Sequence, residues 1–154
     1  MSEKLRKILM LDDDYESMQS LQVFVKRELN MDVELTAEKK LLQRLGKEKF
    51  DLLVVDLMIH PKSFNGENRE VENIHYDDVK WDRTGLEFIR RFRKGEYTHG
   101  GQGTSVDVPI IIMSAVSDTA ANGEWGKIIQ NERRMEKPFR LSDFMKLVNT
   151  LLQE

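Results

Sequence analysis

The sequence predicts an α/β domain in which a parallel sheet is covered by helices on both faces. Three short apolar runs, at 8–11, 52–59 and 109–114, do not alternate with polar residues. Such runs are typical of strands that are buried on both faces. Segments with helical periodicity lie between them, so strands and helices alternate along the chain. This alternation favours a doubly wound α/β fold.

The first half of the predicted fold runs from the strand at 8–11 to the strand at 52–59. A helix that begins near Asp14 follows the first strand, because apolar residues recur every three or four positions as far as residue 29. Residues 32–35 alternate between polar and apolar side chains, which favours a strand at the edge of the sheet. A short second helix is expected at residues 41–45.

The second half continues with a helix around residues 86–92, the strand at 109–114, and a further strand that ends near residues 135–139. The last helix has the clearest periodicity, with apolar residues three or four positions apart from Leu141 onward. Because this helix reaches the end of the sequence, we expect a single domain over residues 1–154 with no attached output domain.

Two stretches do not fit this alternation. Residues 59–84 mix charges with scattered aromatic residues, and we interpret them as an inserted loop within the domain. His60 and His75 in this loop are expected to be solvated, with metal ligation as the alternative. Residues 95–107 carry four glycines and predict a flexible loop.

Composition and charge exclude several classes of protein. The formal net charge of −3 provides no basic field for nucleic acid or for an anionic membrane. The absence of cysteine excludes disulfides and thiolate metal sites, and fits a reducing compartment. No apolar run is long enough to cross a membrane, and the first residues lack the apolar core of a signal peptide. We therefore expect a cytoplasmic protein with no direct nucleic-acid or membrane partner.

Polar residues gather at the carboxyl ends of the predicted strands, where open α/β sheets bind their ligands. Asp12–Asp14 follow the first strand, and Asp56 lies inside an otherwise apolar run. Carboxylates crowded there lose hydration and repel one another, and a hard divalent cation such as Mg²⁺ offsets both effects. Ser114 and Lys137, at later strand ends, would contact phosphate oxygens. The combination predicts a phosphoryl-transfer site.

Each of these residues also has a purely structural interpretation. Asp12–Asp14 alone would cap a helix, Asp56 alone would be a satisfied structural carboxylate, and Ser114 and Lys137 alone would simply end strands. Their joint order along the chain, each at a strand end, is what favours a site.

The order Asp12-Asp13, Asp56, Ser114-Ala115 and Lys137-Pro138-Phe139 resembles the receiver domain of two-component response regulators. The segment that begins at Gly85 also resembles the start of the third helix in that family. The resemblance implies a stand-alone, CheY-like domain with a flavodoxin-like five-stranded parallel sheet of order 2-1-3-4-5. It further implies a phosphorylation-dependent switch in a two-component system or phosphorelay.

The resemblance also implies roles for individual residues. They are the phosphoacceptor Asp56; the Mg²⁺ ligands Asp12, Asp13, Asp56 and the backbone carbonyl of Met58; the phosphate-binding and switch residues Ser114, Ala115 and Lys137; and Pro138, after a candidate cis peptide bond. A histidine kinase or phosphotransfer protein would donate the phosphoryl group, and an unidentified protein target would respond to it. The domain would catalyse only its own phosphorylation and its own slow dephosphorylation.

Three departures from the family pattern carry expectations of their own. The insertion at 59–84 begins beside the predicted site, so it would cover that site or contact a partner. Arg134 stands where the family usually has a switching Tyr or Phe, and residues 117–130 are polar, so we expect a short or irregular fourth helix and a rearranged signalling face. In the family, the residues at the positions of Met58 and Val116 tune how readily water attacks the acyl phosphate. Both are apolar here and cannot orient that water by hydrogen bonding, which predicts slow self-dephosphorylation.

Two other functions compete with the phosphorylation switch. One is a degenerate receiver that acts as a phosphate-independent interaction module. The other is a small phosphatase of the haloacid-dehalogenase type, whose D-x-D motif Asp12–Asp14 would match. That family needs a further acidic pair after its lysine, and only Asp143 and Glu154 follow Lys137.

Overall fold

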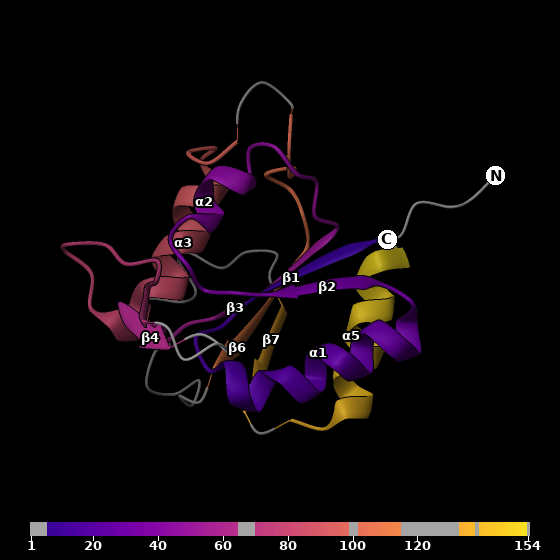
Figure 1. Ribbon diagram of the computed structural model, residues 1–154. Helices are drawn as coiled ribbons and strands as arrows, with labels where there is room; N and C mark the ends of the chain where they lie inside the picture. The colour runs from indigo at the N-terminus through magenta and orange to yellow at the C-terminus, as the bar shows by residue number, and fades with distance from the viewer. Residues whose placement is uncertain (1–5, 65–69, 99–101, 115–132, 138, 154) are drawn as a thin grey trace.

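The computed structural model describes residues 6–64, 70–98, 102–114, 133–137 and 139–153, and its centre is a five-stranded parallel sheet (Figure 1). The strands are β1 (Lys7–Leu11), β2 (Asp32–Leu35), β3 (Leu52–Asp56), β6 (Ile110–Ser114) and β7 (Arg133–Glu136). They lie in the order β2-β1-β3-β6-β7, and every neighbouring pair is parallel. Counted along the chain within this sheet, the order is 2-1-3-4-5, which confirms the predicted topology and the edge position of residues 32–35.

Helices cover both faces of the sheet. They are α1 (Tyr15–Leu29), α2 (Leu41–Arg44), α3 (Thr84–Arg93) and α5 (Leu141–Gln153). Figure 1 shows α1 and α5 together on one face and α2 and α3 on the other. The helix expected within residues 117–130 lies outside the described residues. In the part of the chain that the structure describes, no helix is long and apolar enough to span a membrane.

The central strands are apolar throughout because each of their faces has its own core. In β1, Ile8 and Met10 pack toward α1 and α5, whereas Leu9 and Leu11 pack toward α2 and α3. All four side chains are at most 1% exposed. The same division in β3 and β6 explains why the apolar runs do not alternate with polar residues.

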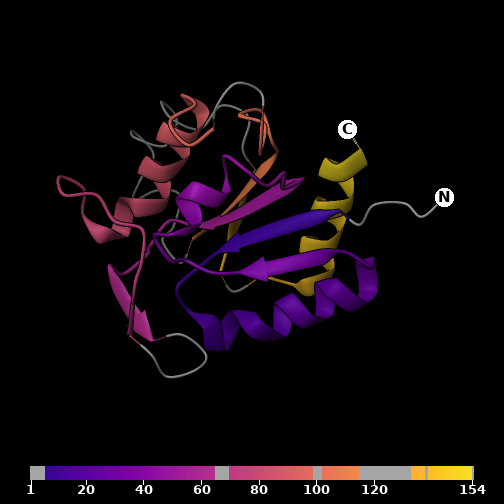
Figure 2. The same cartoon turned by 45° about the horizontal axis from the view of Figure 1, so that its top comes forward.

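The inserted segment 59–84 is not a loop throughout. It contains an antiparallel hairpin of β4 (Lys62–Phe64) and β5 (Glu70–Glu72), followed by the 3₁₀ turn η1 (Trp81–Arg83). Figure 2 shows the hairpin beyond the carboxyl ends of the parallel strands. Strands of three residues are too short to produce a recognisable period, so the sequence pattern did not indicate them.

The described part of the glycine-rich stretch 95–107 is held by a buried threonine. Thr104 is 1% exposed, and its hydroxyl donates to the carbonyl of Glu48 at 2.7 Å and accepts from the N–H of Phe50 at 3.1 Å. Thr104 thus attaches this part of the stretch to the segment that precedes β3, a contact that the glycine-rich pattern did not indicate.

Candidate functional site

Four neighbouring strands bring their carboxyl ends to one edge of the sheet, and each supplies one of the predicted site residues. Asp12 follows β1, Asp56 ends β3, Ser114 ends β6, and Lys137 follows β7. The register holds these ends level, since Asp56 pairs with Met113 in β6 and the N–H of Lys137 donates to the carbonyl of Ser114 at 2.8 Å. The parallel topology thus assembles residues that lie far apart in the sequence.

Three carboxylates form the acidic part of this site. Asp12, Asp13 and Asp56 each place an oxygen within 4.8 Å of the others. Asp12 is fully buried and Asp56 is 7% exposed, whereas Asp13 is half-buried. Like charges this close together repel strongly in a medium of low dielectric constant.

Lys137 provides the positive charge that faces this cluster. Its Nζ donates to Asp12 Oδ2 at 2.8 Å and to Asp56 Oδ2 at 3.1 Å. Burial lowers the pKa of Lys137, but the two carboxylates outweigh that effect and raise the pKa above its ordinary value. One ammonium group against three carboxylates leaves the site with an excess of negative charge when all three are ionised.

Backbone N–H groups fix the orientation of each carboxylate. Asp12 Oδ1 accepts from the N–H of Asp14 at 2.9 Å, and Asp56 Oδ1 accepts from the N–H of Met58 at 3.1 Å. Asp13 Oδ2 accepts from the N–H of His60, also at 2.9 Å. The third of these bonds comes from the inserted segment.

The raised pKa of Asp56 shows that the ionised carboxylate is disfavoured at this position. Burial, followed by the charge of Asp12, raises this pKa from 3.8 to about 7, although Lys137 and the N–H of Met58 oppose the change. Burial also raises the pKa of Asp13, and the N–H of His60 opposes that rise. Two neighbouring carboxylates with raised pKa values, one buried and one half-buried, are a feature of functional sites.

The donor set fits a hard divalent cation. Asp12, Asp13 and Asp56 supply carboxylate oxygens from two adjacent strand ends, and such oxygens are the ligands that Mg²⁺ prefers. An added positive charge would relieve the repulsion that raises the pKa of Asp56. The Met58 peptide lies next to the Asp56 carboxylate, and its carbonyl remains a predicted ligand.

The remaining predicted residues separate into those near the cluster and those with other roles. Ser114 is 2% exposed at the end of β6. Asp14 is the N-cap of α1 and accepts from the N–H and the hydroxyl of Ser17 at 3.2 and 2.6 Å. The capping interpretation of the acidic run therefore holds for Asp14, while Asp12 and Asp13 lie in the cluster with Asp56. Ala115 and Pro138 lie outside the described residues.

Neither histidine of the insertion belongs to the carboxylate cluster. The ring of His60 stacks on Trp81, with 4.5 Å between ring centroids. His75 Nε2 lies 2.9 Å from Glu72 Oε1. His60 is exposed and His75 is partly exposed, as expected for residues of a surface segment. The sequence pattern did not indicate the hydrogen bond that the His60 backbone makes to Asp13.

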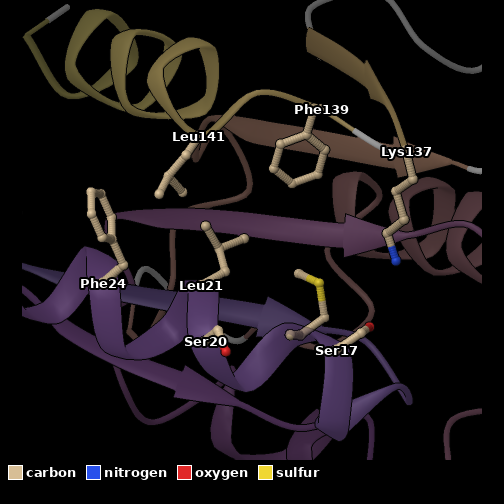
Figure 3. A pocket seen from close by; sticks show the side chains of 8 residues that line it. Ser17, Ser20, Leu21, Phe24, Lys137, Phe139 and Leu141 are labelled. Atoms are coloured by element: carbon tan, nitrogen blue, oxygen red, sulfur yellow. The ribbon is translucent and has the colours of Figure 1, made fainter.

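An apolar cavity opens beside the site, between α1 and the start of α5. Its volume is about 600 Å³, and its lining includes Leu21, Phe24, Phe139 and Leu141. Figure 3 shows the Lys137 side chain reaching the same end of the cavity as Ser17, while Phe24 and Leu141 lie at the other end. The cavity therefore joins an apolar surface to the end of the sheet where Lys137 faces Asp12 and Asp56.

Comparison with known proteins identifies the fold. No protein-family model matches the sequence, and no curated protein matches it. Among solved structures, a Francisella response-regulator receiver domain has a TM-score of 0.66 at 20% identity, covering 96% of this chain and 97% of that chain. The receiver domain of a Pseudomonas aeruginosa sensor histidine kinase, solved with magnesium coordinated in its active site cleft, has a TM-score of 0.65 at 16% identity, covering 98% and 100%.

A third neighbour is the Vibrio cholerae chemotaxis protein CheY4, with a TM-score of 0.61 at 17% identity and coverage of 96% and 99%. In all three comparisons the alignment spans nearly the whole of both chains. The chain therefore has the fold of a CheY-like response-regulator receiver domain, as the resemblance in the sequence implied.

Proposed function

We propose that this protein is a phosphorylation-dependent signalling switch that accepts a phosphoryl group on Asp56 with the help of Mg²⁺. The observation that carries the proposal is the group of Asp12, Asp13 and Asp56 within 4.8 Å, with Lys137 bonded to two of the three. Bound Mg²⁺ would supply positive charge for these carboxylates and for the phosphoryl oxygens.

The residues of the chain have distinct parts in the transfer. A carboxylate oxygen of Asp56 attacks the phosphorus of a phosphohistidine, a P–O bond forms, and the P–N bond breaks as imidazole leaves. The N–H of Met58 and the ammonium group of Lys137 hold the carboxylate in place. The ammonium group of Lys137 then forms an ion pair with one phosphoryl oxygen, and the Ser114 hydroxyl donates a hydrogen bond to another.

The donor in this scheme is a histidine kinase or a histidine phosphotransfer protein, and the phosphorylated domain then signals through contact with a target protein. A donor histidine that reaches Asp56 brings its own surface over α1 and the cavity beside Lys137. Such an exchange takes place in the cytoplasm, where we place the protein. Its chemistry is limited to its own phosphorylation and its own slow dephosphorylation.

Intact-mass spectrometry after incubation with acetyl phosphate tests the proposal. We expect the wild-type protein to gain one phosphoryl group only when Mg²⁺ is present. Asp56→Asn should gain none, whereas Asp32→Asn, which removes an exposed carboxylate at the opposite edge of the sheet, should behave as wild type.

The alternative is an interaction module that works without phosphate. It is favoured by β7, where Arg134 is exposed at the position of the usual switching aromatic residue. A folded wild-type protein that gains no phosphoryl group, from acetyl phosphate or from a purified phosphotransfer protein, would contradict the switch and support this module.

A further inference from the structure

The backbone of His60 joins the acidic cluster to the inserted segment. Its N–H donates to Asp13 Oδ2 at 2.9 Å, and its carbonyl accepts from Asn73 Nδ2, also at 2.9 Å. The ring of His60 stacks on Trp81. Both backbone groups of one residue are thus engaged, one by a predicted metal ligand and the other by a side chain that follows β5.

Asn73 is itself held rigidly. It is fully buried, its own N–H donates to the carbonyl of Pro61 at 2.8 Å, and it forms an antiparallel bridge with Glu38. The next residue, Ile74, is also fully buried, and its N–H donates to the carbonyl of Ala37 at 2.9 Å. A side chain fixed on this scaffold gives the His60 carbonyl little freedom to move.

We propose that Asn73 is a positioning residue for the metal site, which acts through the His60 backbone to orient the carboxylate of Asp13. This inference rests on the proposed Mg²⁺-dependent function. Asp13 is the one member of the cluster that is only half-buried, so its side chain depends most on such support. With Oδ2 held by the insertion, Oδ1 remains for the cation, and less rotational freedom is lost when the cation binds.

Through these hydrogen bonds, Mg²⁺ binding at Asp13 and the stability of the inserted segment should influence each other. Groups that orient a metal ligand from behind commonly change metal affinity by about 10- to 100-fold when they are lost. Coupling of this kind is reciprocal, so Mg²⁺ bound at Asp13 would in turn stabilise the segment that contains His60 and Asn73. The amide hydrogens of Asn73 and Ile74 should therefore exchange more slowly with solvent when Mg²⁺ is present.

Isothermal titration of the metal-free protein with MgCl₂ tests the proposal. We expect Asn73→Ala to weaken Mg²⁺ binding by about 10- to 100-fold. Glu72→Ala is the matched control, because it removes an exposed carboxylate one residue away, and we expect its affinity to stay within about twofold of wild type. Asn73→Ser, which keeps a polar side chain too short to reach His60, is the second variant if Asn73→Ala does not fold.

A double-mutant cycle separates positioning from general damage. If Asn73 acts through Asp13, then Asn73→Ala should have no further effect on Mg²⁺ affinity in an Asp13→Asn background. Wild-type affinity in folded Asn73→Ala, or effects that add in the double variant, would overturn this inference alone. A wild-type protein that binds no Mg²⁺ would overturn the inference together with the proposed function.

Discussion

The backbone of Gly85 lies directly against the backbone of Asp56. The N–H of Gly85 donates to the carbonyl of Leu57 at 3.0 Å, and a Cβ atom added to Gly85 would lie 2.2 Å from the carbonyl oxygen of Asp56. The whole inserted segment separates these two residues in the sequence, yet α3 begins against the end of β3. The insertion therefore leaves the fold next to Asp56 and rejoins it at the same place.

This contact predicts that Gly85→Ala destabilises the protein and impairs the site. The added methyl group must push apart two backbones, and overpacking of this kind costs about 1–3 kcal/mol. We expect a corresponding loss in the free energy of unfolding measured in urea, and slower phosphorylation of Asp56 by acetyl phosphate. In Gly95→Ala, the added Cβ meets nothing within 4 Å, so only the positive φ of 86° opposes the substitution. That control should phosphorylate at the wild-type rate; an equal effect of both substitutions would contradict the prediction.

The raised pKa of Asp56 predicts how stability depends on pH in the absence of Mg²⁺. Between pH 4 and 7 the folded state binds a proton at Asp56 that the unfolded state has released, because the pKa is about 7 in the fold and 3.8 ordinarily. The free energy of unfolding should therefore contain a contribution that falls as the pH rises through this window. Asp56→Asn removes that contribution, so the variant should be more stable than wild type at pH 8, by at most about 4 kcal/mol.

Urea unfolding at several pH values checks this prediction. The difference between Asp56→Asn and wild type should be absent near pH 4, where Asp56 is mostly protonated in the fold. Asp32→Asn, at the opposite edge of the sheet, serves as the control for a change of one carboxylate. A difference that stays constant from pH 4 to pH 8 would show that Asp56 does not titrate in this window.

The same group should make Mg²⁺ binding depend on pH. The cation prefers the ionised carboxylate, so it must displace a proton from Asp56 below pH 7. We expect the affinity to increase up to about pH 7 and then to level off. Titration calorimetry in two buffers with different enthalpies of ionisation should detect the released proton at pH 6 and little release at pH 8. Equal apparent enthalpies in the two buffers at pH 6 would contradict the prediction.

Lys137→Met tests how far one ammonium group stabilises the cluster. Methionine has a similar shape but no charge, so Asp12 and Asp56 lose the partner at 2.8 and 3.1 Å. Breaking a buried pair costs about 3–5 kcal/mol. Because the Lys137 side chain is 24% exposed, we expect a smaller loss of about 1–3 kcal/mol at pH 8. Mg²⁺ should reduce this loss, whereas Lys146→Met, on the exposed face of α5, should show none.

The parallel sheet and the acidic cluster were predictable because both depend on strong local patterns. A strand buried on two faces must be apolar throughout, so the runs around Leu9, Val54 and Ile112 indicated β1, β3 and β6 directly. Polar residues at the ends of such strands must then meet at one edge of the sheet. The position of Asp56 inside an apolar run was the clearest of these signals.

The insertion was not predictable in the same way, because backbone groups hold it in place. The bond from His60 to Asp13 uses an N–H that every residue except proline carries, so no side chain marks it in the sequence. The hairpin is attached through the carbonyl of Glu72 and the N–H of Ile74, again without a side-chain pattern. The role of Asn73 depends on its complete burial, which a polar residue in a polar stretch does not indicate.

The side chain of Met58 predicts a long-lived phosphorylated state. Its N–H donates to Asp56 Oδ1 at 3.1 Å, and its side chain is half-buried two residues after the carboxylate that would carry the phosphoryl group. A thioether is a poor hydrogen-bonding group and does not orient a water molecule for attack on the acyl phosphate. Met58→Asn introduces a donor and an acceptor there, and we expect it to shorten the lifetime of the phosphoprotein severalfold. Met58→Leu keeps the size and the apolar character, and should leave the lifetime unchanged.

The decay is measured by intact-mass spectrometry after acetyl phosphate has been removed on a desalting column, with Mg²⁺ kept constant. Mg²⁺ must be equal in the three samples because it also influences hydrolysis. A half-life of only seconds for the wild-type phosphoprotein would contradict the prediction that the apolar side chain of Met58 slows hydrolysis. Equal acceleration by Met58→Leu and Met58→Asn would instead assign the effect to altered packing around Asp56, since only asparagine adds hydrogen-bonding groups.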